Sequence, residues 1–231
     1  MRTLLVCVVF GSCQVGERVE RLAAGGCEHE LVWIDPGDGV DRGFWIGRYE
    51  VTNAQFAVFV AATGYDGSDH PSSKPTEPFL AHFENGQPPA GEATHPVCNV
   101  NLHHARAYCA WLSQSTGRRV RLPRDAEWQL AATGGQQRVY PWGDAWDPTR
   151  CNWGAPDDGF VASAPVGSFP SGVSTTNVHD LAGNIWEWTQ EGHLRGGPWC
   201  MGAESVRVAD IADEDDDRAD DKFGLRIVVE R

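Results

Sequence analysis

Long apolar runs are absent from this sequence of 231 residues. No segment approaches the roughly 20 apolar residues that a membrane-spanning helix needs, so the sequence predicts no such helix. Lys and Arg are also scarce, 19 against 32 Asp and Glu, which gives a net charge of -13. Because no basic stripe interrupts this charge, the surface repels phosphate, and nucleic acid and anionic lipid headgroups are excluded as direct partners. Basic or metal-bearing partners suit the charge.

Several catalytic and metal-binding patterns are missing as well. The seven cysteines include no Cys-x-x-Cys pair, which argues against zinc ribbons and thioredoxin-like redox chemistry. The eight histidines show no HxH or HxxxH spacing, and His103 and His104 point about 100° apart on a helix. We therefore interpret the histidines as surface or capping residues. No Gly-x-Ser-x-Gly segment supports a nucleophilic serine.

The first residues resemble a short bacterial lipoprotein signal. Arg2 gives a positive start, residues 3–10 are apolar, and two small residues precede Cys13. We expect residues 1–12 to be a signal peptide, Cys13 to carry a lipid, and the protein to be exported to the cell envelope, the periplasm or the extracellular space. A lipid on Cys13 would attach it peripherally to a membrane. A buried first strand and a misplaced start codon are the alternatives.

The remaining chain predicts one α+β domain over 31–231, preceded by a polar linker over 13–30. Thr52 and Gln55 form a capping box that starts a helix, and Gly64 ends it. Two more helices are expected over 102–116 and up to Gly134, and an irregular, proline-rich segment is expected over 66–96. Short strands are predicted over 31–34, 43–46, 186–189, 194–195, 206–208 and 225–229.

Ten short segments occur in an order typical of one family. The chain resembles the sulfatase-modifying factor, or formylglycine-generating enzyme, family over nearly all of 31–229. This resemblance implies a C-type-lectin-like α+β fold with little regular secondary structure and long loops. The segments are Tyr49-Glu50-Val51-Thr52-Asn53, Pro96-Val97, Ala107-Tyr108-Cys109, Arg121-Leu122-Pro123, Ala126-Glu127-Trp128, Pro141-Trp142-Gly143, Pro165-Val166-Gly167, Gly183-Asn184-Ile185-Trp186-Glu187-Trp188, Arg195-Gly196-Gly197 and Gly224-Leu225-Arg226.

The resemblance also implies two structural calcium ions. Calcium takes six to eight oxygen ligands, which carboxylates, amides and carbonyls in turns supply. In the alternative interpretation, Asp158 and Asp180 only cap turns. The first implied site consists of Asn152, Trp153, Asp158 and Phe160, and the second of Asp180, Gly183, Ile185 and Glu187.

The chain departs from the family at the catalytic cysteines. The family's enzymes hold copper between two cysteines, spaced Cys-x4-Cys, just after the Gly-Gly pair. Here Cys200 stands near the first position, but 203–206 contain no second thiol. We therefore do not expect a complete copper site, and a small buried hydrophobe is the ordinary role of such a cysteine. Cys27, folded against Cys200, would complete the pair. The helical domain of the family's iron-dependent sulfoxide synthases has no room in this chain.

The resulting hypothesis is a calcium-stabilised, non-catalytic binding or accessory module. Its ligand, a protein, a peptide or a glycan, would occupy a groove lined by Trp199, Cys200, Met201, Arg207 and the acidic segment 210–221. That segment either recruits a cation or basic peptide or is a solvated loop, in which Asp217 and Arg218 pair locally. A formylglycine-generating oxidase, or a related metal-dependent oxygenase that uses Cys200, is the alternative. A purely structural surface lipoprotein is the third hypothesis.

Overall fold

The computed structural model describes residues 18–154 and 159–231, and the expected helices are present in it. They are α1 Asn53–Thr63, α2 Leu102–Thr116 and α3 Asp125–Thr133. Within the described residues, no helix is long and apolar enough to cross a bilayer. The segment between α1 and α2 contains neither helix nor strand, which confirms the prediction of an irregular segment over 66–96. The α+β prediction is therefore correct.

Local capping explains where the helices begin and end. The Thr52 hydroxyl accepts the backbone N–H of Gln55, and the Gln55 side chain accepts the N–H of Thr52, so the expected capping box is confirmed. A second box at α2 joins Asn101 and His104 in the same way. Gly64, Gly117 and Gly134 follow the three helices with left-handed backbone angles, which glycine adopts at little cost.

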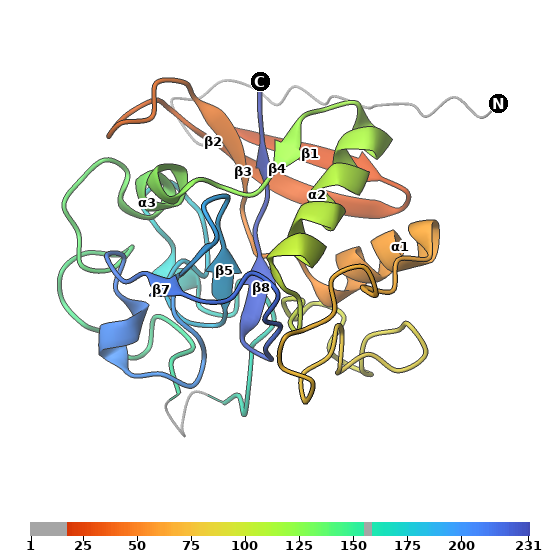
Figure 1. Ribbon diagram of the computed structural model, residues 1–231. Helices are drawn as coiled ribbons and strands as arrows, with labels where there is room; N and C mark the ends of the chain where they lie inside the picture. Colours follow the sequence, from red (N-terminus) through yellow and green to blue (C-terminus); the bar gives the residue numbers. More distant parts are fainter. Residues whose placement is uncertain (1–17, 155–158) are drawn as a thin grey trace.

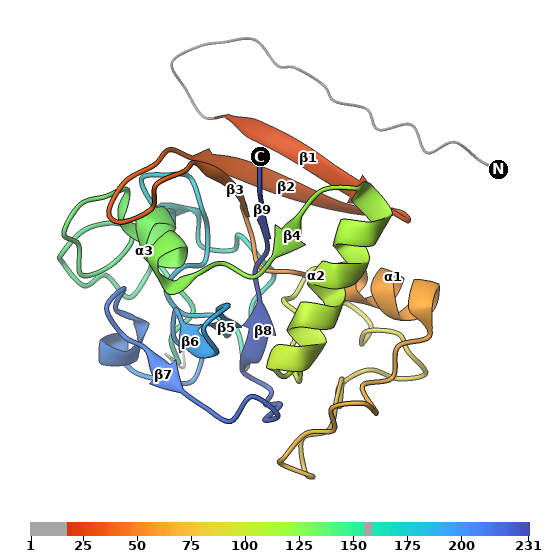
Figure 2. The same ribbon diagram turned by 45° about the horizontal axis from the view of Figure 1, so that its top comes forward.

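The strands form two sheets that meet near the end of the chain. The larger sheet has the order β1-β2-β3-β9-β4 and the smaller one the order β7-β6-β5-β8. In Figures 1 and 2, α1 and α2 lie on one side of the strands and α3 on the other. The strands are β1 Val19–Ala24, β2 Cys27–Ile34, β3 Phe44–Gly47, β4 Val120–Arg121, β5 Trp186–Trp188, β6 His193–Arg195, β7 Ala212–Asp213, β8 Phe223–Leu225 and β9 Val228–Val229. Two 3-10 turns, η1 Pro170–Gly172 and η2 Ala203–Val206, complete the elements.

The linker interpretation of 13–30 is wrong for its described second half. Residues 19–30 belong to an antiparallel hairpin of β1 and β2, which turns through Gly25 and Gly26. Leu22, Ala24 and Cys27 are buried, while the residues between them face solvent. Because half of a two-sided strand is polar, the segment resembles a linker in composition.

The strand expected over 206–208 is also wrong, since η2 and a turn occupy this segment. Val206 packs in a small cluster with Tyr140 and Cys151, and Val208 packs in a different cluster with Trp128. The alternating pattern therefore reflects two separate burial sites rather than one face of a sheet.

Candidate calcium and ligand site

A fully buried ion pair lies where the two sheets meet. Arg226 stands between β8 and β9, and its guanidinium donates from Nη2 to Glu187 Oε1 at 2.6 Å and from Nε to Oε2 at 3.0 Å. The other donors reach the carbonyls of Gly47 and His179, at 2.9 and 2.8 Å. Trp128 Nε1 donates to Glu187 Oε2 at 2.9 Å. Arg226 thus connects β3, β5 and the loop that contains His179.

Two further carboxylates lie close enough to this pair to interact with it. Glu50 is buried, and burial raises the pKa of its carboxyl well above the usual value, with Asp180 and Glu187 adding to the rise. Burial raises the pKa of Asp180 to about 6. Three carboxylates therefore interact with the single guanidinium of Arg226 in this part of the described structure. Ionising all three carboxyl groups would leave an excess negative charge, which a divalent cation that prefers oxygen ligands would neutralise.

The residues implied for the second calcium site differ in whether the structure leaves them available as ligands. Asp180 and Glu187 are brought together, but Asp180 also accepts the N–H of Gly167 at 2.6 Å, and Glu187 is already paired with Arg226. Ile185, between them in sequence and fully buried, belongs to the core.

The two implied sites are contiguous in space. Asn184 N donates to Asn152 O at 2.8 Å, and a Cβ on Gly183, whose φ is 79°, would lie 2.1 Å from that same oxygen. The Asn152 side chain donates to Ala162 O at 2.9 Å. Trp153 and Phe160 are partly buried nearby in the sequence, and Asp158 lies outside the described residues.

Glu50, Asn184 and Arg226 are the site residues that sequence reasoning missed. Asn184 Nδ2 donates to both oxygens of Glu50, at 3.1 and 3.0 Å, so the amide connects Glu50 with the turn that follows Gly183. All three residues stand inside segments that carry the family resemblance. A charged or amide residue amid apolar neighbours in those segments was the available signal.

The residues of the expected groove do not all line one surface. Cys200 and Met201 are exposed, and Trp199 beside them is partly buried. Arg207 instead pairs with Glu204 and lines a hollow with Tyr140 and Trp146. The run Trp199–Met201 contributes no residue to this hollow. Of the residues expected to line the groove, Trp199, Cys200 and Met201 stay together, and Arg207 lies in a different hollow.

The described cysteines surround no common centre. Although Cys200 is exposed, partial shielding of its thiol from water, with Asp221 and Asp220 adding to it, raises the pKa of that thiol, so the neutral form is favoured. Cys27 is buried in β2, with its sulfur 3.3 Å from His29 Nε2 and 3.5 Å from the Tyr108 hydroxyl. Cys98 is buried and shares the neighbouring carboxylates Asp220 and Asp221 with Cys200.

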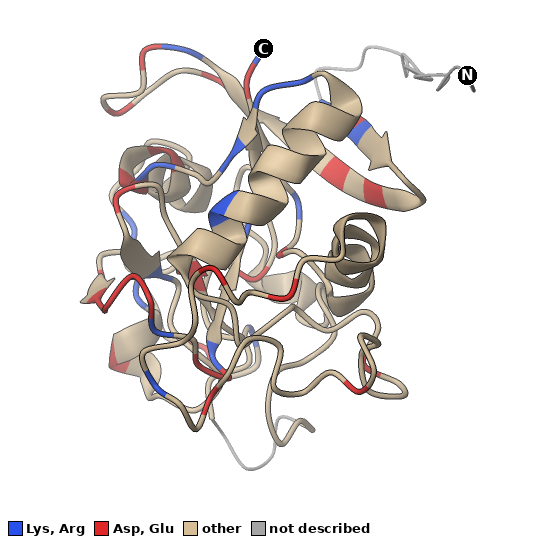
Figure 3. Ribbon diagram, turned by 45° about the vertical axis from the view of Figure 1, so that its right-hand side comes forward, with Lys and Arg blue, Asp and Glu red and all other residues tan. Residues whose placement is uncertain are grey.

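The acidic segment is anchored rather than fully solvated. Arg218 pairs with Glu214 at 2.7 Å and Asp220 at 2.8 Å, so the expected pairing with Asp217 is wrong. Asp220 is fully buried and also pairs with Lys74 and Lys222. Figure 3 shows the acidic residues in loops near the start of α2, which itself carries a single charged residue, Arg106.

A separate hollow of about 900 Å³ lies beside β2 and α3. Trp33 contributes an aromatic face, with the guanidinium carbons of Arg18 and Arg231 5.7 and 5.9 Å from its centroid. Sequence reasoning missed this hollow because its lining comes from four segments that lie apart in the sequence. The arginines that line it are Arg18, Arg42, Arg119, Arg121, Arg124 and Arg231, against Asp35, Asp41, Glu127 and Glu230.

Comparisons with known proteins agree with this architecture. The family described as "Sulfatase-modifying factor enzyme 1-like domain" matches residues 5–231. The chain is 36% identical over 154 residues to the inactive C-alpha-formylglycine-generating enzyme 2 of Bos taurus, covering 57% of this chain and 49% of that protein. It is 36% identical over 186 residues to the formylglycine-generating enzyme of Thermomonospora curvata, covering 63% and 58%. The chain thus spans only about half the length of these relatives.

Two solved structures share the fold. PvdO from Pseudomonas aeruginosa superposes with a TM-score of 0.72 at 22% identity, over 93% of this chain and 98% of that one. Treponema denticola variable protein 1 gives 0.69 at 19% identity, over 92% and 99%. These likenesses establish the fold, an α+β domain of the formylglycine-generating-enzyme type.

Proposed function

Because the chain belongs to the sulfatase-modifying factor enzyme 1-like family, we propose that it is a non-catalytic member that acts as a binding or accessory module. The observation that carries this proposal is the setting of Cys200. Its thiol is exposed and its pKa is raised, whereas the thiolate is the form that binds metals and attacks substrates. The resemblance of the chain to enzymes named inactive in Bos taurus and Mus musculus points in the same direction.

Calcium is the cation that we propose for the buried carboxylates. Asp180 and Glu50 would supply oxygens, and the carbonyl-rich turn around Gly183 would supply more. Glu187 would attract calcium less strongly than Glu50 or Asp180, because Arg226 already neutralises the Glu187 carboxylate. Bound calcium would join the turn that contains Asp180 to the segment around Glu50.

Metal content of the purified full chain tests both points. After incubation with calcium and with Cu(I) under reducing conditions, followed by dialysis, we expect retained calcium and no stoichiometric copper in elemental analysis. Asp180→Asn should lower the calcium content, because it removes a charged ligand from the site. Cys200→Ala should leave calcium unchanged and is the matched control.

Stoichiometric copper that disappears in Cys200→Ala would overturn the non-catalytic proposal. The alternative, a formylglycine-generating oxidase with a rearranged site, would then hold, and Cys98 is the second thiol to test because it shares Asp220 and Asp221 with Cys200. A Cys98→Ser variant should then lose copper as well. Calcium content unchanged by Asp180→Asn would instead refute our choice of calcium ligands.

The partner that we propose is a protein, a peptide or a glycan. Two surfaces are suited to contact it, the exposed run Trp199–Met201 and the arginine-lined hollow beside Trp33. The hollow suits an acidic group, because arginine binds carboxylates with two parallel hydrogen bonds. The rest of the surface is strongly acidic and disfavours nucleic acid.

We further propose that the protein is exported and attached to the cell envelope through a lipid on Cys13, a residue outside the described range. Growth of an expressing bacterium with a labelled fatty acid should label the wild-type chain. The Cys13→Ser chain should stay unlabelled and leave the membrane fraction. Equal labelling of the two chains, or none of either, would contradict the proposal.

A further inference from the structure

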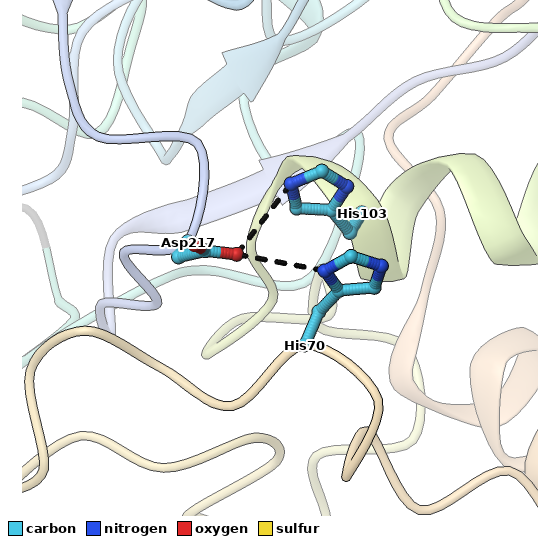
Figure 4. Close-up of side chains that lie close together, drawn as sticks. All are labelled: His70, His103 and Asp217. Carbon is cyan, nitrogen blue, oxygen red and sulfur yellow. Dashed lines mark ion pairs between the residues drawn. The ribbon is translucent and has the colours of Figure 1, made fainter.

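Two histidines and an aspartate from three separate segments meet at the surface beside α2. His70 lies in the loop after α1, His103 in the first turn of α2, and Asp217 in the acidic segment before β8. Their ligand atoms all lie within 4.8 Å of one another. Figure 4 shows both rings directed at the same carboxylate. Sequence analysis interpreted these histidines as surface or capping residues, since no short spacing connects them.

The three side chains converge without hydrogen-bonding one another. Asp217 Oδ1 is 3.5 Å from His103 Nε2 and 3.7 Å from His70 Nδ1, and this buried oxygen has no hydrogen-bond donor among the described residues. A buried carboxylate oxygen without a donor is costly. The two rings stack with centroids 3.9 Å apart and an angle of 8° between their planes.

One buried amide fixes the backbone of all three segments. The Asn101 side chain donates from Nδ2 to His70 O at 3.0 Å and to Asp217 O at 3.2 Å, and its own residue caps the helix that carries His103. Ser73 N donates to the same Asp217 carbonyl at 2.9 Å. The backbone at all three positions is therefore held by the fold, whereas the partly exposed side chains can still turn.

The distances suit a transition metal. Bonds of about 2.0 to 2.2 Å from zinc to nitrogen and oxygen place tetrahedral ligand atoms about 3.3 Å apart. The observed 3.5 and 3.7 Å exceed this, and the two nearly parallel rings must turn before both nitrogens face one ion, a movement that partly exposed side chains allow. Imidazole nitrogen favours Zn²⁺ and related ions over calcium, which prefers oxygen. The surrounding segment, with Asp213, Glu214, Asp215 and Asp216, adds negative charge.

We propose that His70, His103 and Asp217 bind one divalent transition-metal ion of the Zn²⁺ type. Side-chain exposures of 44%, 27% and 49% leave the remaining coordination positions open to water or to a ligand atom. The ion joins the irregular segment between α1 and α2, which carries His70, to the acidic segment. This site is separate from the buried carboxylates around Arg226 and does not depend on the function proposed above.

Titration calorimetry with Zn²⁺ tests the site. The protein is the full chain without an affinity tag, carries Cys200→Ser so that the exposed thiol cannot bind zinc, and is kept in calcium throughout. We expect one Zn²⁺ per chain, and an affinity at least about 100-fold lower in His103→Ala and Asp217→Asn. Co²⁺ should give a visible absorption spectrum that both variants lose.

His193→Ala is the matched control. His193 is partly exposed and also faces two carboxylates, Asp125 at 2.5 Å and Asp213 at 3.4 Å, but no second imidazole. Its removal should leave zinc affinity unchanged. Folding of each variant is checked by circular dichroism, and alanine at the partly exposed position 103 suits a helix. Failure of the parent to bind stoichiometric zinc, or equal affinity in His103→Ala, would overturn the proposal.

Discussion

Replacing Arg226 by methionine is expected to lower the free energy of unfolding by about 3 to 5 kcal/mol. The guanidinium is fully buried, pairs with Glu187 and satisfies the carbonyls of Gly47 and His179. Methionine fills similar volume but leaves Glu187 without its cation, next to Glu50 and Asp180. Urea denaturation followed by tryptophan fluorescence measures the loss.

Two companion variants separate charge from packing. Arg226→Lys keeps the positive charge but not the planar fork, so we expect an intermediate loss. Arg226→Met combined with Glu187→Gln removes both charges and keeps an acceptor for Trp128 Nε1. This double variant should recover part of the stability. An Arg226→Met protein within about 1 kcal/mol of wild type would contradict the role of the pair.

Acid is expected to destabilise the protein through His29. Burial lowers the pKa of this histidine to about 4, from an ordinary value of 6.5. Its ring contacts the Tyr108 hydroxyl at 2.8 Å and the sulfur of Cys27. Between about pH 4 and 6.5, His29 is therefore protonated in the unfolded chain and neutral in the folded chain. The contribution is fully present above pH 6.5 and is lost as the pH falls towards about 4, by about 3 kcal/mol at most.

Comparison with His29→Gln isolates this contribution from other titrating groups. Glutamine keeps a hydrogen-bonding side chain beside Tyr108 but does not titrate. The difference in unfolding free energy between wild type and variant should shrink as the pH falls from 6.5 to 4, measured by urea denaturation at several pH values. A difference that stays constant over this range would show that His29 does not couple folding to pH.

Features fixed by neighbouring residues were predictable from the sequence. The start of α1 depends on Thr52 and Gln55, and its end on Gly64, so a few adjacent residues decide both boundaries. The β1–β2 hairpin was missed because its outward residues resemble a linker. The separation of Val206 and Val208 into two clusters was missed because alternation alone does not identify a partner strand.

The candidate sites show the same limit. The resemblance led to Asp180 and Glu187, but the neutralisation of Glu187 by Arg226 depends on a contact between distant segments. His70, His103 and Asp217 share no short spacing, and only the fold, through Asn101, brings them together. Sequence patterns indicate ligands well when they lie on one helix or in one turn, and poorly when they come from three loops.

The place of β9 in the larger sheet has a consequence for biosynthesis. Val228 and Val229 pair with both β3 and β4, so β9 stands between two strands that are synthesised much earlier. While the chain emerges from the ribosome, the hairpin and helices can form, but β3 and β4 have no strand between them. Such long-range pairing folds slowly. For the exported protein that we propose, a larger sheet that stays incomplete until β9 is synthesised would favour translocation of the unfolded domain.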